Sequence, residues 1–224
     1  GRRTVACVPD SAGVDARHPN GARPLLLPPG VTWDGSSSGV PGVPGVLTFA
    51  AGNRLPAATT GSVADTRRGF TAGAWLTPGA PSGVPAVALA QTGPDGRGFD
   101  LGLTSDGRWQ FRVRSASGIA VVTAPIRSEP GHAVYIAGVA DAVNRELRLY
   151  VNGSLASVAG FTPARSGAPD GPVTVGGAPA LSGISRPWGG QVGNPVVAQA
   201  PLPRNALSDL AEGMFFWTEG GGLD

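Results

Sequence analysis

The side chains that could carry out chemistry are few in this chain, and they stand far apart in the sequence. One cysteine and two histidines are present among the 224 residues. A catalytic thiol at Cys7 would need a base in a recognisable motif, and neither His18 nor His132 stands in one. Two isolated histidines do not make a metal site, and no His-Glu-x-x-His zinc helix or phosphate-binding glycine loop occurs. These residues predict a protein that is not an enzyme.

The residues that fit binding are concentrated in two glycine-rich loops. One loop holds Trp188 close to Arg186, and an indole ring beside a guanidinium can stack on a sugar or clamp a peptide. The other loop holds Asp95 and Arg97 at a Gly-Pro-Asp-Gly turn. We therefore predict Trp188, Arg186, Asp95 and Arg97 as ligand-binding residues. The alternative for Trp188 is that its ring plugs one end of the fold.

The charge distribution argues against nucleic acid as a partner. All 17 basic residues are arginines, the formal net charge is +2, and the arginines are scattered. A nucleic-acid interface needs a basic stripe, which the sequence does not show. No apolar run is long enough to cross a membrane as a helix, so we expect no membrane insertion. The chain opens on Gly-Arg-Arg without a signal-peptide pattern, as expected of an excised domain or a processed product.

The candidate binding residues must be positioned by short segments in which apolar and polar residues alternate, with turns between the segments. The chain contains 36 Gly and 22 Pro without a collagen-like period. Apolar and polar residues alternate at 70–76, 99–104 and 109–114, which is the pattern of strands with one buried face. Asn152 and Gly153 form the preferred sequence of a tight hairpin turn, because both residues tolerate a positive φ.

The sequence therefore predicts an all-β fold, a jelly-roll sandwich of two antiparallel sheets. One short helical turn is expected near the C-terminus, at 205–212. We expect roughly a dozen strands in all. Besides the alternating segments, strands are expected at 4–8, 25–27, 31–33, 46–49, 86–91, 119–123, 134–140, 146–151, 155–158, 173–175 and 191–200.

Three segments resemble a known family in their order and spacing. They are Phe-Thr-Ala-Gly-Ala-Trp at 70–75, Gly-His-Ala-Val-Tyr-Ile-Ala-Gly-Val at 131–139 and Glu-Leu-Arg-Leu-Tyr-Val-Asn-Gly at 146–153. Together they resemble the laminin-G-like branch of the concanavalin A-like lectin/glucanase superfamily, in its bacterial, actinobacterial-type form. The resemblance implies a concanavalin A-like sandwich with a concave face and variable loops along one edge. We expect a single domain at 1–212 and a C-terminal tail at 213–224.

The chain departs from the family pattern in two places. Ala133 and Tyr135 stand where the family usually has Trp and His, and Gly193 and Asn194 stand where it usually has an Asp pair. The resemblance implies that one residue of that pair commonly contributes to a structural calcium. Calcium takes several oxygen ligands, usually including carboxylates. The candidate calcium ligands are therefore Asp10 and Asn194, and no other cofactor is expected.

The resemblance also implies a test for catalysis. The glucanases of the superfamily carry Glu-x-Asp-x-Glu on one strand, which directs all three carboxylates into the cleft. No two glutamates of this chain are four residues apart; they are Glu129, Glu146, Glu212 and Glu219. We therefore expect no catalytic residues.

The function expected from the sequence is that of a non-catalytic recognition module. It would bind a glycan or a protein as part of a secreted or surface protein, so an extracellular or cell-surface location is expected. The alternative is a structural or assembly domain that scaffolds a neighbouring domain or subunit and binds no small ligand. An apolar cluster in the tail would then make that contact, formed by Met214, Phe215, Phe216 and Trp217.

Overall fold

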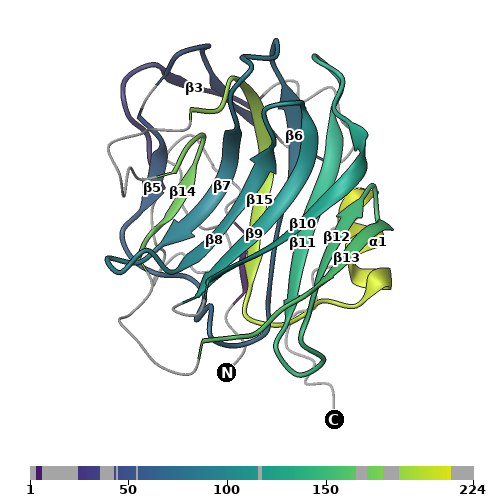
Figure 1. Ribbon diagram of the computed structural model, residues 1–224. Helices are drawn as coiled ribbons and strands as arrows, with labels where there is room; N and C mark the ends of the chain where they lie inside the picture. The colour runs from purple at the N-terminus through teal and green to yellow at the C-terminus, as the bar shows by residue number, and fades with distance from the viewer. Residues whose placement is uncertain are drawn as a thin grey trace.

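Two antiparallel β-sheets lie face to face in the computed structural model of the chain (Figure 1). The structure describes residues 4–6, 25–35, 43, 45–53, 55–115, 118–164, 171–178 and 187–212. Outside the described residues lie Cys7, Asp10, His18, Arg186, Met214, Phe215, Phe216 and Trp217. The two-layer arrangement confirms the fold class predicted from alternation and turns.

The eight-stranded sheet has the order β13-β12-β11-β6-β15-β4-β3, and β1 pairs with β15 along the edge that β4 also occupies. All of its pairings are antiparallel. Its strands are β1 (Thr4–Ala6), β3 (Val31–Asp34), β4 (Val46–Phe49), β6 (Phe70–Pro78), β11 (Val134–Asp141), β12 (Glu146–Val151), β13 (Ser154–Gly160) and β15 (Gly190–Ala198).

The seven-stranded sheet has the order β10-β9-β8-β7-β14-β5-β2. Its strands are β2 (Leu25–Leu26), β5 (Ala57–Thr59), β7 (Ala86–Thr92), β8 (Gly98–Leu103), β9 (Arg108–Ser115), β10 (Gly118–Arg127) and β14 (Val173–Val175). The sequence did not indicate β5, which is a short run of Ala, Ala and Thr between two partners. The sequence also predicted a shorter β10, which in the structure extends to Arg127.

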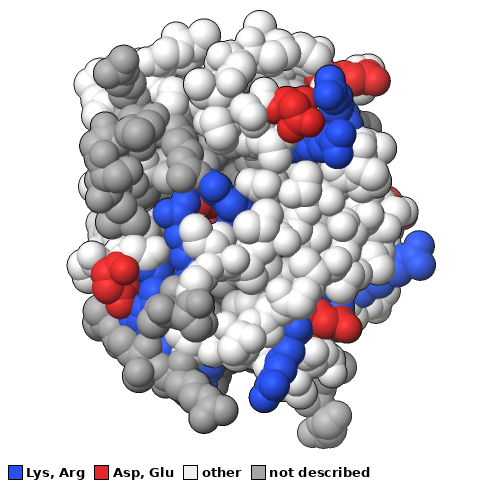
Figure 2. Space-filling view, viewed as in Figure 1, with Lys and Arg blue, Asp and Glu red and all other residues white. Residues whose placement is uncertain are grey.

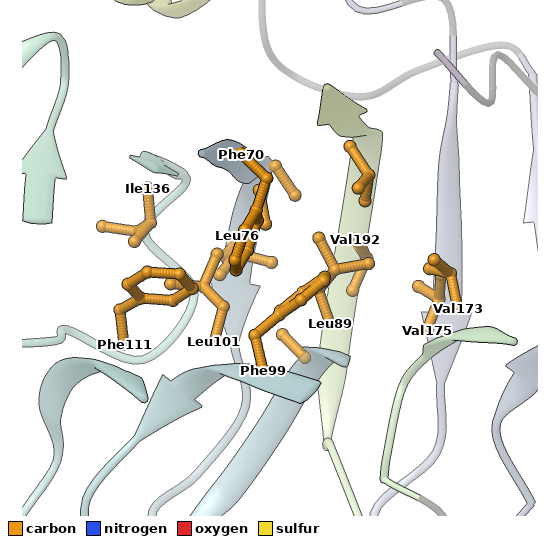
Figure 3. Close-up of a cluster of buried hydrophobic side chains, with 14 of the residues drawn as sticks. Phe70, Leu76, Leu89, Phe99, Leu101, Phe111, Ile136, Val173, Val175 and Val192 are labelled. Carbon is orange, nitrogen blue, oxygen red and sulfur yellow. The ribbon is translucent and has the colours of Figure 1, made fainter. Parts of the chain in front are cut away.

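The core lies between the two sheets and is built from the residues that the alternation selected. Phe70 on β6 meets Phe99 on β8 at 5.1 Å between ring centroids, and Phe111 on β9 lies 6.1 Å from Phe70. Figure 3 shows these rings directed into the same layer together with Leu76, Leu101 and Ile136. The predicted inward faces of β6, β8 and β9 are therefore confirmed.

The predicted hairpin at Asn152 and Gly153 is also confirmed. Both residues have a positive φ, 46° for Asn152 and 73° for Gly153, as the tight turn between β12 and β13 requires. The Asn152 side chain accepts a hydrogen bond from the Tyr135 backbone N–H at 2.9 Å. The turn is thereby fastened to the neighbouring strand β11.

The short helix expected at 205–212 is confirmed as α1 (Arg204–Ala211). It packs on the outer face of the eight-stranded sheet, a contact that the sequence did not predict. Leu207 is fully buried in a second apolar cluster with Tyr135 and Tyr150, and the Trp75 ring lies 5.9 Å from the Tyr135 ring at its edge. Part of this sheet is therefore buried on both faces. No helix in the described ranges is long and apolar enough to span a membrane.

Candidate functional site

Trp188 lies inside the molecule. Its side chain is 1% exposed, and its ring lies 6.4 Å from the ring of Trp109 at an interplanar angle of 33°. Its backbone N–H donates to the Gly176 carbonyl at 3.1 Å. A sugar can stack only on an exposed ring face, so this position corresponds to the alternative in which Trp188 closes one end of the sandwich.

Asp95 and Arg97 form a local ion pair in the turn between β7 and β8. The Arg97 Nε and a terminal guanidinium nitrogen both lie 2.6 Å from Asp95 Oδ2, and the Arg97 side chain is 6% exposed. This turn follows Thr92, the last residue of β7, whereas Trp188 lies near Ala86, the first residue of the same strand. Seven strand residues span roughly 20 Å. The structure therefore does not bring Trp188 together with Asp95 and Arg97.

A hollow of about 560 Å³ lies beside Trp188, and we name it the rim pocket. Five segments surround it: residues 51–52 after β4, the β6–β7 loop at 79–84, the β8–β9 turn at 104–107, residues 127–128 at the end of β10, and residues 187–189 before β15. The volume lies within the range of small-molecule sites in proteins. The loops at one edge of the sandwich thus enclose a ligand-sized space.

Backbone hydrogen bonds hold the walls of the rim pocket together. The Gly79 N–H donates to the Gly189 carbonyl at 2.7 Å, which joins the β6–β7 loop to the segment before β15. The Ser128 N–H donates to the Gly107 carbonyl at 2.8 Å, which joins the end of β10 to the β8–β9 turn. The pocket is therefore formed before any ligand arrives, which lowers the entropic cost of binding.

Asp106 and Arg127 supply the charged groups of the rim pocket. Asp106 accepts a hydrogen bond from the Thr104 hydroxyl at 2.5 Å. It forms ion pairs with Arg108, whose Nε lies 3.0 Å from the carboxylate, and with Arg127 at 3.7 Å. The hydrogen bond from Thr104 holds the pKa of Asp106 below its ordinary value, so this carboxylate is ionised at neutral pH. A carboxylate that accepts and a guanidinium that donates suit the hydroxyl groups of a sugar.

The rim pocket also has an apolar side. Val84, Ala86 and Leu103 line it, and the Val84 side chain is 54% exposed. Apolar surface beside a few convergent polar groups is the usual composition of a binding site. The sequence could not reveal the pocket, because its walls come from segments far apart in the chain.

Asn194 occupies a bulge in β15. Its φ is 44°, the register with β6 shifts between Gly193 and Val196, and its side chain is buried. Both amide atoms lack a hydrogen-bond partner among the described residues. Calcium takes six to eight oxygens, and Asn194 would supply one side-chain oxygen. The calcium site with Asp10 remains a prediction.

Another charged group lies on the outer face of the seven-stranded sheet. Asp100 on β8 accepts from Arg112 at 2.5 and 3.0 Å and from Arg114 at 3.1 Å, and the Asp100 side chain is largely buried. Figure 2 views the molecule from the side of this sheet and shows basic side chains with an acidic one at a hollow over its middle. Alternation placed the two arginines on this face, but only the strand register could show that Asp100 lies between them.

The fold resembles that of several solved proteins. The native heptameric SAP-like pentraxin from Limulus polyphemus is 17% identical over 81% of this chain and 80% of that one, with a TM-score of 0.53. The CBM40 of the Ruminococcus gnavus IT-sialidase, bound to α2,3-sialyllactose, is 17% identical over 64% and 83%, with a TM-score of 0.53. These likenesses establish the fold alone.

A third similar structure comes from an enzyme. Domain 4 of AbnA, a GH43 extracellular arabinanase from Geobacillus stearothermophilus in complex with arabinotriose, is 12% identical over 81% of each chain, with a TM-score of 0.58. A comparison with curated proteins found no match.

A laminin G family model, described as the concanavalin A-like lectin/glucanases superfamily, matches residues 52–205. The matched region runs from just before β5 to the start of α1, and it includes all three segments on which the sequence resemblance rests. It spans well over half of the 224 residues. The chain therefore belongs to the concanavalin A-like lectin/glucanases superfamily, as a laminin-G-like domain.

Proposed function

We propose that this chain is a non-catalytic recognition module that binds a glycan in the rim pocket. The observation that carries the proposal is the joint presence of Asp106, Arg127 and an apolar wall around a preformed space of about 560 Å³. The carboxylate accepts hydrogen bonds from sugar hydroxyls, the guanidinium donates to sugar oxygens, and Val84 and Leu103 contact the C–H surface of the ring.

The composition of the pocket supports binding rather than hydrolysis. Cleavage of a glycosidic bond by the usual route uses a pair of carboxyl groups on either side of the bond. Among the described residues that line the rim pocket, Asp106 is the only carboxylate. A single carboxylate anchors a sugar without providing both an acid and a nucleophile.

Two similar structures support a saccharide as the ligand. The Ruminococcus gnavus CBM40 is bound to sialyllactose, and AbnA domain 4 is in complex with arabinotriose. Both share the sandwich of this chain at low sequence identity. In the proposed role, the chain works outside the cell or at its surface and delivers a larger protein to its glycan.

A glycan array with matched variants tests the proposal. We expect wild-type protein to bind one class of glycan, and Asp106→Asn and Arg127→Ala to bind it about tenfold more weakly, because each loses a charged hydrogen bond to the sugar. Asp209→Asn, on α1 at the other sheet, is the control and is expected to bind as wild type does.

The opposite result would support the structural alternative. If no glycan on the array binds wild-type protein, and an oligomer seen by light scattering dissociates when residues 213–224 are removed, the chain is an assembly domain. Equal glycan binding by wild type and Asp106→Asn would instead place the sugar outside the rim pocket.

A further inference from the structure

A second hollow lies at the other end of the sandwich, and we name it the end pocket. Its volume is about 610 Å³, larger than that of the rim pocket. The loop that precedes β6, the β11–β12 turn and the segment after β13 form its walls. Its lining residues are Asp65, Arg67, Arg68, Ala142, Arg145, Thr162, Pro163 and Ala164.

The residues that line the end pocket carry a net positive charge. Three arginines and one aspartate line it, which leaves a net charge of +2. Asp65 accepts from Arg67 at 2.7 and 3.1 Å, and Arg68 lies 3.5 Å from the same carboxylate. The hydrogen bond from Arg67 holds the pKa of Asp65 below its ordinary value. Asp65 offsets one of the three positive charges, so a net charge of +2 remains to attract an anionic ligand.

Arg145 contributes the most available guanidinium. It lines the pocket, and no described side chain forms an ion pair with it. The acidic residues near Arg145 in the sequence form ion pairs with Arg148 instead, because Asp141 lies 3.0 Å and Glu146 2.9 Å from the Arg148 guanidinium. Arg145 therefore has donors to offer to a ligand.

The turn that carries Arg145 is held in place. The carboxylate of Asp141 accepts from the backbone N–H groups of Val143 and Asn144 at 3.1 and 2.9 Å, and the Phe161 N–H donates to the Arg145 carbonyl at 2.8 Å. Arg145 itself has a φ of 58°, a conformation that favours glycine or asparagine. A long basic side chain therefore stands at a position where the backbone alone would favour a smaller residue.

We propose that the end pocket binds an oxyanion group, a sulfate or a carboxylate carried by an acidic ligand. The guanidinium groups of Arg68 and Arg145 line one hollow from different loops, and the planar fork of each guanidinium matches two oxygens of such a group. Small side chains at Ala142 and Ala164 leave space for the body of the ligand. This site is separate from the rim pocket and does not depend on the function proposed there.

Binding of dextran sulfate to the whole chain, measured by calorimetry with neutral dextran as the reference, tests this proposal. Wild-type protein is expected to bind dextran sulfate and not neutral dextran, and the affinity is expected to fall with salt. Arg145→Ala and Arg68→Ala are each expected to weaken binding about fivefold, because each removes one partly exposed charge contact. Arg204→Ala, on α1, removes the same charge elsewhere and is expected to change the affinity less than about twofold.

Inorganic sulfate provides a second arm that distinguishes a small anion from a polymer. Sulfate stabilises most proteins by exclusion from their surface, so the decisive quantity is the difference in its effect on Tm between wild type and Arg145→Ala. A larger rise for wild type means that the free ion occupies the site.

Two results would overturn the proposal. In one, Arg145→Ala and Arg68→Ala bind dextran sulfate as tightly as wild type. In the other, Arg204→Ala weakens binding as much as they do, which would mean that only total charge matters. Arg145→Ala and Arg68→Ala leave every lining residue of the rim pocket in place, so failure here and failure at the rim pocket are separable.

Discussion

Trp188 and Trp109 pack against each other with their ring centroids 6.4 Å apart, and together they close one end of the core. Trp109 comes from β9, and Trp188 comes from the segment just before β15. Each is about 1% exposed. The floor of the rim pocket is therefore the outer boundary of the hydrophobic core, so changes at this pair affect stability before they affect recognition.

Replacement of Trp188 by alanine is expected to lower the free energy of unfolding by about 3–5 kcal/mol, because it leaves a cavity against Trp109. Urea unfolding followed by circular dichroism measures the change. Trp188→Phe is the control and is expected to lose less, since it keeps an aromatic ring in contact with Trp109. If Trp188→Ala is as stable as wild type but no longer binds glycan, Trp188 contacts the ligand rather than the core.

Gly138 on β11 is expected to tolerate no side chain. A Cβ at this position would lie 2.3 Å from the ring of Phe111, which is fully buried and cannot move aside. Gly138→Ala is expected to destabilise the chain by about 1–3 kcal/mol or more through overpacking between the sheets. Gly160→Ala is the matched control, because nothing lies within 4 Å of its Cβ position. Equal thermal unfolding of the two variants would contradict the packing described here.

Asp141 is expected to make stability depend on acid pH. Its burial raises the pKa, but hydrogen bonds from Asn144 and Val143 and the charge of Arg148 outweigh that effect, so the pKa lies below its ordinary value of 3.8. A carboxylate with a depressed pKa in the folded state stabilises the fold above its unfolded pKa, and this contribution is lost as pH falls through the folded value.

The measurement is the free energy of unfolding from about pH 6 down to about pH 2. Wild-type stability is expected to fall below about pH 4. Asp141→Asn is expected to be less stable at neutral pH and to show a shallower fall, because the titrating group has been removed. Identical slopes for the two proteins would show that Asp141 does not contribute.

Much of the fold could be predicted because its information is local. The alternation at 70–76, 99–104 and 109–114 determined which residues enter the core, and Asn152 with Gly153 determined a hairpin. Where a strand is apolar on both faces, as in β11, alternation carries no such signal. That is why the docking of Leu207 and α1 onto Tyr135 could not be anticipated.

The candidate site was harder to predict because it depends on how distant loops meet. The chemistry of Asp95 and Arg97 is local, and the structure shows them paired with each other. The pairing of Asp106 with Arg127 depends on the register of β8, β9 and β10. The contact of Trp188 with Trp109 depends on how the segment before β15 meets the start of β9. The glycine-rich composition of the loops did not indicate which of them meet at one edge of the sandwich.

The two hollows lie at opposite ends of β6: the end pocket beside the residues that precede it and the rim pocket beside its last residue. A ligand in one does not obstruct the other, so the two sites can be occupied independently. A polymer that carries both neutral and acidic sugars could engage both ends at once and gain avidity, provided that it spans the distance. Two shorter saccharide chains, one at each end, would instead be held together by the sandwich, which would then act as a spacer of fixed length between them.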